Sequence, residues 1–305
     1  MRPTESAIGA LGLALWAMSA AATTAAQAQQ LVFEPVAVSE RVLSRPHDLI
    51  LSRDGRHLFV SDLGNHVVRV LDADSLADVG VIGSGELSSP HDVALDHQGR
   101  LMVADIGNNR VAIFELSGVS ARLVDQLSEG LGRPEGVAQG PDGRVYVTSV
   151  AGSHITVFSN GRRLGRAGGP GSGPNRYSRP HDIDVDDSGR VVVADPGNNR
   201  LQVLSPELEF RFSIGGSPPY DFNEPKYFAL DGEGRLYVGD QFNHRVLVFD
   251  RSLALVGQMG TGLAGDAPDQ LNGLEGVAVR GEDVWIADTY NNRVVRYRKK
   301  AGPAS

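Results

Sequence analysis

The sequence contains no cysteine, and only three of its 305 residues are lysine. The absence of cysteine excludes disulfide bonds and thiolate metal ligands, so packing and hydrogen bonds must hold the fold. The formal net charge is −8, and the basic residues form no stripe along any segment. Because nucleic-acid binding requires clustered cationic side chains, we expect no nucleic-acid partner.

Long hydrophobic runs are also scarce. Apolar segments are short and interrupted by turn residues, which favours strands over long helices. The longest apolar segment, around residues 8–18, falls short of the about 20 residues that a membrane-spanning helix needs. It is followed by Ala26, Gln27 and Ala28, a small-x-small cleavage pattern. Residues 1–28 are therefore predicted to be a signal peptide, removed after Ala28 from a periplasmic or extracellular protein, with an uncleaved anchor as the alternative.

Repetition is the main feature that the sequence does contain. The stretch RPHDLILSRDGRHLFVSD at residues 45–62 returns as SPHDVALDHQGRLMVAD from residue 89 and as RPHDIDVDDSGRVVVAD from residue 179. Alignment on the histidine of this stretch gives six units, spaced by 44, 44, 46, 45 and 49 residues. We call the aligned site the histidine position, and its residues are His47, His91, Glu135, His181, Lys226 and Glu275.

Each unit has the pattern of four short strands. In the second unit the strands are DVALD, LMVAD, RVAIFE and RLVDQL, with the turns HQGR and IGNN after the first two. Four antiparallel strands per unit at this period are typical of propeller blades. The sequence thus predicts an all-β, six-bladed propeller over residues 31–300 and a disordered tail at residues 301–305. The last unit lacks a fourth strand, so we expect the unassigned strand LVFEPVAV at residues 31–38 to complete it.

A loop of the form Asp-x-x-Asn-x-Arg follows the second strand of most units. The first unit has Val67 at the arginine position, and the third unit, TSVAGSHITV, lacks the pattern. We expect the Asp to accept backbone N–H groups and the Arg to reach a carboxylate on a neighbouring strand. The segments DIGNNRVAIF, DPGNNRLQVL, DQFNHRVLVF and DTYNNRVVRY resemble NHL repeats, which form six-bladed β-propellers. The resemblance implies no single activity, because that family includes protein-binding, RNA-binding and enzymatic members.

The histidine position begins the first strand of each unit, which lines the central channel of a propeller. Six polar side chains are therefore expected to encircle one mouth of the channel. One explanation is structural: Pro sets the strand entry, while His and Asp bond the backbone of a neighbouring blade. The chemistry at this position changes between units, however, and polar groups that converge on one mouth favour a ligand site. We predict that a monomer binds a protein or a small molecule there.

Alternate blades bring three of these side chains together about a pseudo-threefold axis. The even set offers two imidazoles and one carboxylate: His91, His181 and Glu275. Such a set suits Zn²⁺ or another divalent cation and leaves coordination positions open for water or substrate. The odd set is expected to form a salt-bridged cluster at the mouth: His47, Glu135 and Lys226.

The ring is similar to that of the peptidyl-α-hydroxyglycine α-amidating lyases, in which Pro-His at alternate blades supplies zinc ligands and a following Asp helps to hold calcium. The resemblance implies His91 and His181 as zinc ligands, Asp182 as a Ca²⁺ contact, and metal-dependent cleavage of a carbon–oxygen or carbon–nitrogen bond. The loop DTYNNR is similar to the loop that carries the catalytic tyrosine of that family, which points to Tyr290. Arg179 is a second candidate partner of the ion.

Two alternatives to a lyase remain open. Glu275 stands where the lyases have a third histidine, which favours a propeller that binds a ligand without catalysis. Exposed aromatic residues in the adjoining loops, Tyr177 and Tyr220, are then expected to anchor the partner. The other alternative is a lactonase-like propeller, in which Glu135 and Glu275 would hold a central calcium ion.

Overall fold

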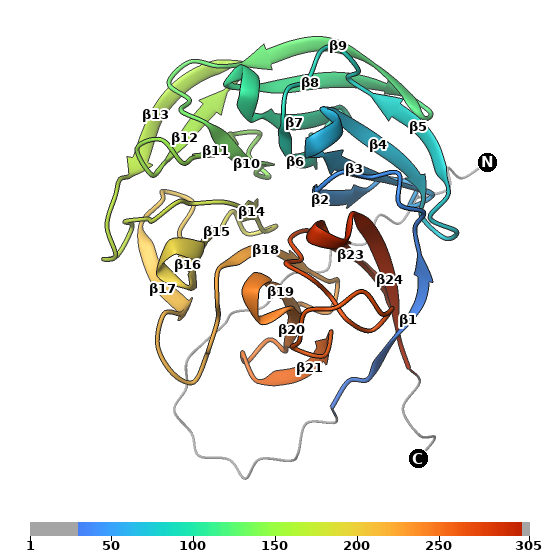
Figure 1. Cartoon of the computed structure of the whole chain (residues 1–305). Helices are drawn as coiled ribbons and strands as arrows, with labels where there is room; N and C mark the ends of the chain where they lie inside the picture. Colours follow the sequence, from blue (N-terminus) through green and yellow to red (C-terminus); the bar gives the residue numbers. More distant parts are fainter. Residues whose placement is uncertain (1–29, 301–305) are drawn as a thin grey trace, which may run out of the picture.

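Six four-stranded antiparallel sheets surround a central axis as the blades of a propeller (Figure 1). The computed structural model describes residues 30–300. The all-β, six-bladed fold expected from the repeats is confirmed. The predicted signal peptide and the predicted tail lie outside the described residues. Within the described range the helices are three-residue 3-10 turns, and none is long and apolar enough to cross a bilayer.

The strands of each blade follow one another in the chain, except in the last blade. Blades 1 and 2 consist of β2 (Pro46–Leu51), β3 (His57–Asp62), β4 (Val67–Asp72) and β5 (Asp78–Ile82), and of β6 (Pro90–Leu95), β7 (Leu101–Asp105), β8 (Arg110–Ser117) and β9 (Ser120–Leu127). Blades 3 and 4 consist of β10 (Pro134–Gln139), β11 (Val145–Ser149), β12 (His154–Ser159) and β13 (Arg162–Gly168), and of β14 (Ile183–Val185), β15 (Val191–Asp195), β16 (Arg200–Leu204) and β17 (Phe210–Gly215). Blades 5 and 6 consist of β18 (Pro225–Leu230), β19 (Leu236–Asp240), β20 (Arg245–Phe249) and β21 (Leu255–Met259), and of β22 (Val277–Arg280), β23 (Asp283–Asp288), β24 (Arg293–Lys299) and β1 (Phe33–Val38).

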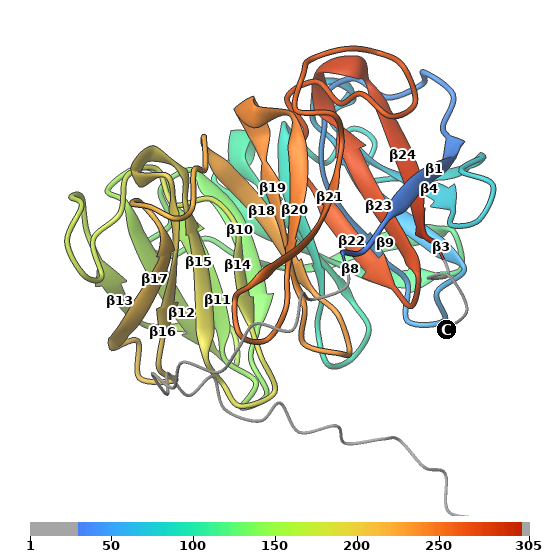
Figure 2. The same ribbon diagram turned by 90° about the horizontal axis from the view of Figure 1, so that it is seen from below.

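Blade 6 takes its outer strand from the other end of the described chain. Strand β1 pairs antiparallel with β24, with Phe33 opposite Lys299 and Val38 opposite Val295. The two strands lie side by side in both views (Figures 1 and 2). Just before β1, the N–H of Leu31 donates to the carbonyl of Val256 in blade 5 at 2.6 Å. The expected ring closure is confirmed, and it pairs the edge that β24 would otherwise expose.

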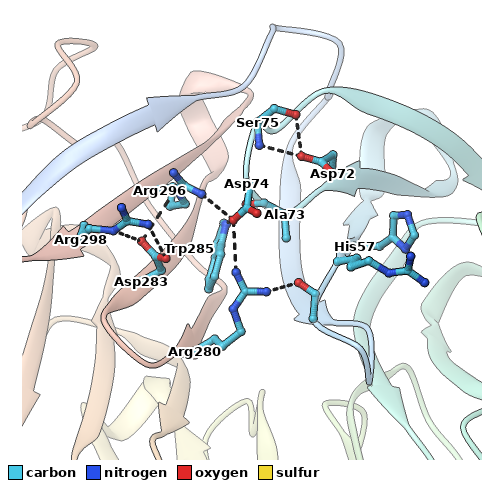
Figure 3. A network of polar contacts seen from close by, with 12 residues as sticks. His57, Asp72, Ala73, Asp74, Ser75, Arg280, Asp283, Trp285, Arg296 and Arg298 are labelled. Carbon is cyan, nitrogen blue, oxygen red and sulfur yellow. Dashed lines mark hydrogen bonds and ion pairs between the residues drawn. The ribbon is translucent and has the colours of Figure 1, made fainter.

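A polar network joins blade 6 to blade 1 (Figure 3). The indole N–H of Trp285 donates to the carbonyl of Ala73 at 2.8 Å, and the guanidinium of Arg280 lies 5.1 Å from the centroid of the Trp285 ring. Arg280 and Arg296 form ion pairs with Asp74 at 3.3 and 3.0 Å. Because Asp74 is exposed, these ion pairs contribute little to stability. The buried indole of Trp285 therefore contributes more to holding blade 6 against blade 1.

Hydrophobic side chains fill the space between adjacent blades. The buried clusters each combine side chains from two neighbouring blades. Between blades 1 and 2, for example, Phe59 and Val70 pack with Leu101 and Val103. Each blade is therefore stabilised mainly through its neighbours, as in other repeat architectures.

The Asp-x-x-Asn-x-Arg loop forms a tight corner between the second and third strands of a blade. In blade 2 this corner contains the 3-10 turn η2 (Ile106–Asn108). One carboxylate oxygen of Asp105 accepts the N–H of Ser88 at 2.7 Å. The other accepts the side chains of Asn108 and Arg110 at 2.7 and 2.9 Å. The corner thus ties the entry of the first strand to the second and third strands.

Similar corners recur in four other blades, at η1 (Leu63–Asn65), η3 (Pro196–Asn198), η4 (Gln241–Asn243) and η5 (Thr289–Asn291). In blade 1 the arginine comes from two positions further along, because Arg69 reaches Asp62 at 3.3 Å and compensates for Val67. Blade 3 has neither the motif nor a 3-10 turn at its corner. The arginine of the motif was expected to reach a carboxylate on a neighbouring strand. In the structure that carboxylate belongs to the Asp of the same corner, which ends the neighbouring strand.

Candidate metal centre at the channel mouth

The residues at the histidine position lie at or just before the start of the innermost strand of each blade, close to the channel axis. His47, His91, Glu135 and Lys226 belong to β2, β6, β10 and β18, while His181 and Glu275 lie two residues before the starts of β14 and β22. A cavity of about 620 Å³ opens at this mouth. It is lined by residues of blades 1 to 4 and, from the other two blades, by Lys226 alone. The cavity is therefore off-centre, on the side of the three histidines.

A left-handed turn delivers each of these residues to the axis. Arg45, Ser89, Arg133 and Arg179 have φ values of 54°, 53°, 53° and 59°, and each directly precedes the proline that starts the segment leading to the axis. A non-glycine residue with positive φ needs support from its surroundings. The corner of the preceding blade supplies that support, since Asn109 accepts the N–H of Arg133 at 2.7 Å. The corners therefore position the rim of the mouth.

Three side chains from successive blades converge beside the cavity. One ligand atom each from His91, Glu135 and His181 lies within 4.8 Å of the other two. The Nε2 atom of His181 is 3.1 Å from a carboxylate oxygen of Glu135. The Nδ1 atoms of His91 and His181 are buried without a hydrogen-bond partner. Two imidazoles and one carboxylate at this separation form a donor set that fits a divalent cation such as Zn²⁺.

Burial sets the protonation of these groups. It lowers the pKa of His91 and of His181 well below the usual histidine value, with the nearby cationic groups as smaller contributors. It also raises the pKa of Glu135 to about 7. Both imidazoles are therefore neutral at pH 7, which is the form that binds metal. A positive ion would favour the ionised form of Glu135.

Glu275 is directed to a different set of partners. Its carboxylate forms a salt bridge with Lys226 at 3.0 Å and accepts a hydrogen bond from Gln241 at 2.7 Å. The Nε2 atom of His47 lies 3.5 Å from it, and the Nδ1 atom of His47 bonds the carbonyl of Arg45 at 2.9 Å. The structure thus brings His91 and His181 together with Glu135, whereas the alternating-blade argument had placed Glu275 with them.

The Asp of the Pro-His-Asp motif links adjacent blades. The carboxylates of Asp48, Asp92 and Asp182 accept the N–H groups of Val93, Val137 and Phe228 in the next blade, at 3.2, 2.5 and 3.0 Å. Burial raises the pKa of all three carboxyls, that of Asp48 to about 7. Within this motif the Asp is a latch between blades, and the His faces the mouth.

The two candidate catalytic partners of the ion differ in position. Arg179 lines the cavity and forms an ion pair with Glu224 of blade 5 at 2.7 Å. Tyr290 belongs to η5, is 45% exposed and is absent from the cavity lining. Tyr227 lies beside the donors, with its ring centroid 5.0 Å from that of His181. It occupies the Asp place of the motif in blade 5, and sequence reasoning gave it no role.

The expectation that Tyr177 and Tyr220 are exposed anchors is wrong. Tyr177 is fully buried, and its hydroxyl donates to Asn175 at 2.8 Å. Tyr220 is half-buried against Phe222 and Phe249. Both tyrosines belong to loops, but their rings pack against the hydrophobic clusters between blades. The composition of the loops does not reveal this packing. The cavity lining includes three arginines, Arg45, Arg133 and Arg179, and neither of these tyrosines.

Fold and mouth together define a six-bladed β-propeller with a polar, histidine-bearing channel entrance. Three segments match the NHL repeat, at residues 87–114, 177–204 and 271–297. The protein is therefore a propeller that carries NHL repeats, and that resemblance is confirmed. No curated protein sequence gives a significant match to the chain.

Many solved structures share the fold at low sequence identity. A Bacteroides thetaiotaomicron protein of unknown function has a TM-score of 0.69 and 14% identity, covering 89% of this chain and 76% of its own. An auxiliary nutrient binding protein from Bacteroides ovatus has a TM-score of 0.66 and 14% identity, covering 90% and 78%. Virginiamycin B lyase from Staphylococcus aureus has a TM-score of 0.61 and 11% identity, covering 88% and 99%. Such similarity establishes the fold alone.

Proposed function

We propose that the protein is an exported, monomeric propeller that binds a ligand at the mouth of its channel, and that His91, Glu135 and His181 hold a divalent cation there. The observation that carries the proposal is the convergence of these three donors, within 4.8 Å of one another, beside a cavity of about 620 Å³. All three residues line that cavity. A ligand in the cavity could therefore reach the ion.

The donor set supports a binding site that includes metal. Two neutral imidazoles and one carboxylate leave at least one coordination position free, and Zn²⁺ in such a site acts as a Lewis acid on a carbonyl or hydroxyl group. The unpartnered Nδ1 atoms of His91 and His181 are buried polar groups that lack a protein partner. The nutrient-binding propellers among the fold relatives favour a binding role, and the pattern of residues 1–28 favours export.

Titration calorimetry with ZnCl₂ on the metal-stripped protein tests the site. We expect one equivalent to bind in wild type and no stoichiometric binding in His91→Ala or His181→Ala. The matched control is His97→Ala, since His97 is an exposed histidine beyond the far end of the same strand, β6. Comparable zinc affinity in wild type and in the His91→Ala/His181→Ala double variant would contradict the proposal.

A metal-dependent lyase is the second candidate function. It is favoured by the open coordination position facing a cavity, which is typical of catalytic zinc sites. Among the cavity residues, Arg179 is placed to contact a substrate, whereas Tyr290 is not part of the lining. Incubation of the zinc-loaded protein with a peptide ending in α-hydroxyglycine, followed by mass spectrometry, tests this candidate. Loss of the terminal group in wild type but not in His181→Ala supports a lyase, and an intact peptide leaves binding alone.

A further inference from the structure

The rim of the channel mouth carries more cationic than anionic side chains. The cations that line the cavity are Arg45, Arg133, Arg179 and Lys226, and Glu135 is the one acid in the lining. The chain as a whole has a net charge of −8. A local excess of cations on an acidic protein is unusual enough to require a reason, and such a region raises the local concentration of anions.

Two of these cations are already neutralised. Arg179 pairs with Glu224 at 2.7 Å, and Lys226 pairs with Glu275 at 3.0 Å. By contrast, no carboxylate of residues 30–300 forms an ion pair with Arg45 or Arg133. Glu135, the acid of the cavity lining, is engaged elsewhere, since it contacts His181 at 3.1 Å. The rim therefore holds two unpaired guanidinium groups.

The backbones of these two arginines are fixed. Arg45 and Arg133 adopt left-handed conformations, with φ values of 54° and 53°. Their N–H groups donate to Asn292 at 2.8 Å and to Asn109 at 2.7 Å, in the corners of the preceding blades. The structure thus anchors the base of each side chain at the mouth while leaving its charged end without a protein partner.

The two arginines also flank one of the metal donors, His91. Arg45 and Arg133 belong to the entries of blades 1 and 3, on either side of blade 2, which supplies Ser89 and His91 to the same cavity. A ligand held above blade 2 therefore meets one arginine on each side and His91 between them, with Glu135 and His181 following in the next two blades. A guanidinium presents a planar fork of N–H groups that matches the two oxygens of a carboxylate or phosphate.

We propose that Arg45 and Arg133 form an oxyanion clamp, so that the ligand of the mouth is a small molecule or peptide terminus bearing a carboxylate or a phosphate. The inference deepens the proposed function and rests on the same cavity. The clamp holds the anionic group while the neighbouring polar group of the ligand faces His91, Glu135 and His181.

Three probes distinguish the clamp from general binding: N-acetylglycine, its neutral analogue N-acetylglycinamide, and inorganic phosphate. Each is titrated calorimetrically into metal-free protein, and the first two also into zinc-loaded protein. We expect N-acetylglycine or phosphate to bind and the neutral amide to bind at least about tenfold more weakly, because a charge-assisted bond is lost. Preference for N-acetylglycine assigns a carboxylate ligand, and preference for phosphate assigns a phosphate ester.

The variants Arg45→Gln and Arg133→Gln should each weaken binding of the preferred anion by about tenfold or more, whereas their zinc affinity should stay unchanged. The matched control is Arg166→Gln, which alters an exposed arginine of β13 outside the cavity lining, and we expect no loss there. Arg45→Lys keeps the charge but not the fork, so it should restore binding only in part.

Equal anion binding in wild type and in the Arg45→Gln/Arg133→Gln double variant would overturn the clamp, as would failure of both anions to bind wild type. If zinc fails to bind wild type, the proposed metal site is wrong. In that case anion binding by the metal-free protein that is lost in the double variant still supports the clamp.

Discussion

Two regions recur around the propeller and differ in how strictly their chemistry repeats: the corner between the second and third strands, found in every blade but the third, and the mouth position at the start of the first strand. The corner has the same Asp, Asn and Arg contacts in blades 2, 4, 5 and 6, and Arg69 restores them in blade 1. The mouth position holds histidine in three blades and one of two other residue types in the remaining three, as Glu135, Lys226 and Glu275 show. Repeated chemistry serves the fold, and varied chemistry at an equivalent position serves the site.

The comparison predicts that corner and mouth substitutions have opposite effects. Corner changes should lower the free energy of unfolding without affecting ligand binding. Mouth changes should affect ligand binding without lowering the free energy of unfolding. The Asp of the Pro-His-Asp motif lies between the two regions, and its substitution should have an intermediate effect on stability that depends on pH.

The largest loss of stability is expected for Asp105→Ala. This change leaves the half-buried guanidinium of Arg110 without its carboxylate and the N–H of Ser88 without an acceptor. Removing one partner of a buried pair costs about 3 kcal/mol or more. Urea unfolding at pH 7 measures the loss, and zinc titration of the folded variant should match wild type. The control is Asp142→Ala, which breaks a more exposed pair with Arg144 and should cost less than about 1 kcal/mol.

An intermediate effect is expected for Asp48→Asn. Burial raises the pKa of Asp48 to about 7, so the folded carboxyl keeps its proton over a range in which the unfolded chain has lost it. The folded state then binds more protons, and its stability falls as pH rises from about 4 to 7. Since Asn cannot titrate, the variant should gain about 2 kcal/mol relative to wild type between pH 5 and pH 7, at about 1.4 kcal/mol per pH unit.

Urea unfolding of both proteins at the two pH values measures this difference. Parallel stability curves would show that Asp48 is ionised in the folded state and that the latch is a charged one. Asp92 still contributes to the slope of the variant, since burial raises its pKa as well.

The smallest change in stability is expected for Glu135→Gln. The substitution removes a desolvated carboxyl whose neighbour, His181, is neutral, so it leaves no buried charge unpaired. The free energy of unfolding should change by less than about 1 kcal/mol. Zinc affinity should nevertheless fall at least about tenfold, because one of three protein ligands is lost. In wild type, zinc affinity should rise as pH rises through about 7, as the metal no longer competes with the proton on Glu135.

Glu275→Gln separates the two possible arrangements of the donors. If His91, Glu135 and His181 are the ligands, this variant binds zinc like wild type, although it loses the salt bridge with Lys226. Loss of zinc binding in Glu275→Gln, with retention in Glu135→Gln, would restore the alternating-blade arrangement.

The fold was predictable from the sequence because its determinants are local and repeated. Turn residues and short apolar runs gave the strands, and the surplus strand at residues 31–38 together with the missing one in the last unit gave the ring closure. The donor set was not predictable by symmetry alone. Equivalent backbone positions surround the axis, but Lys226 and Gln241 hold Glu275 apart from His91 and His181, and these contacts depend on side-chain directions. Tyr177 was misjudged for the same reason, since a loop residue can still be fully buried.

The pairing of β1 with β24 also sets an order of events. During synthesis β1 emerges before all the other strands, but its partner, which includes Lys299, is made last. Until β24 has been made, β1 has no strand with which to pair. The edges of β1 therefore stay exposed even after blade 5 has formed. Such a contact between distant parts of the chain slows folding and prolongs exposure of those edges. The ring can therefore reach its closed form only after translation of the last blade is finished.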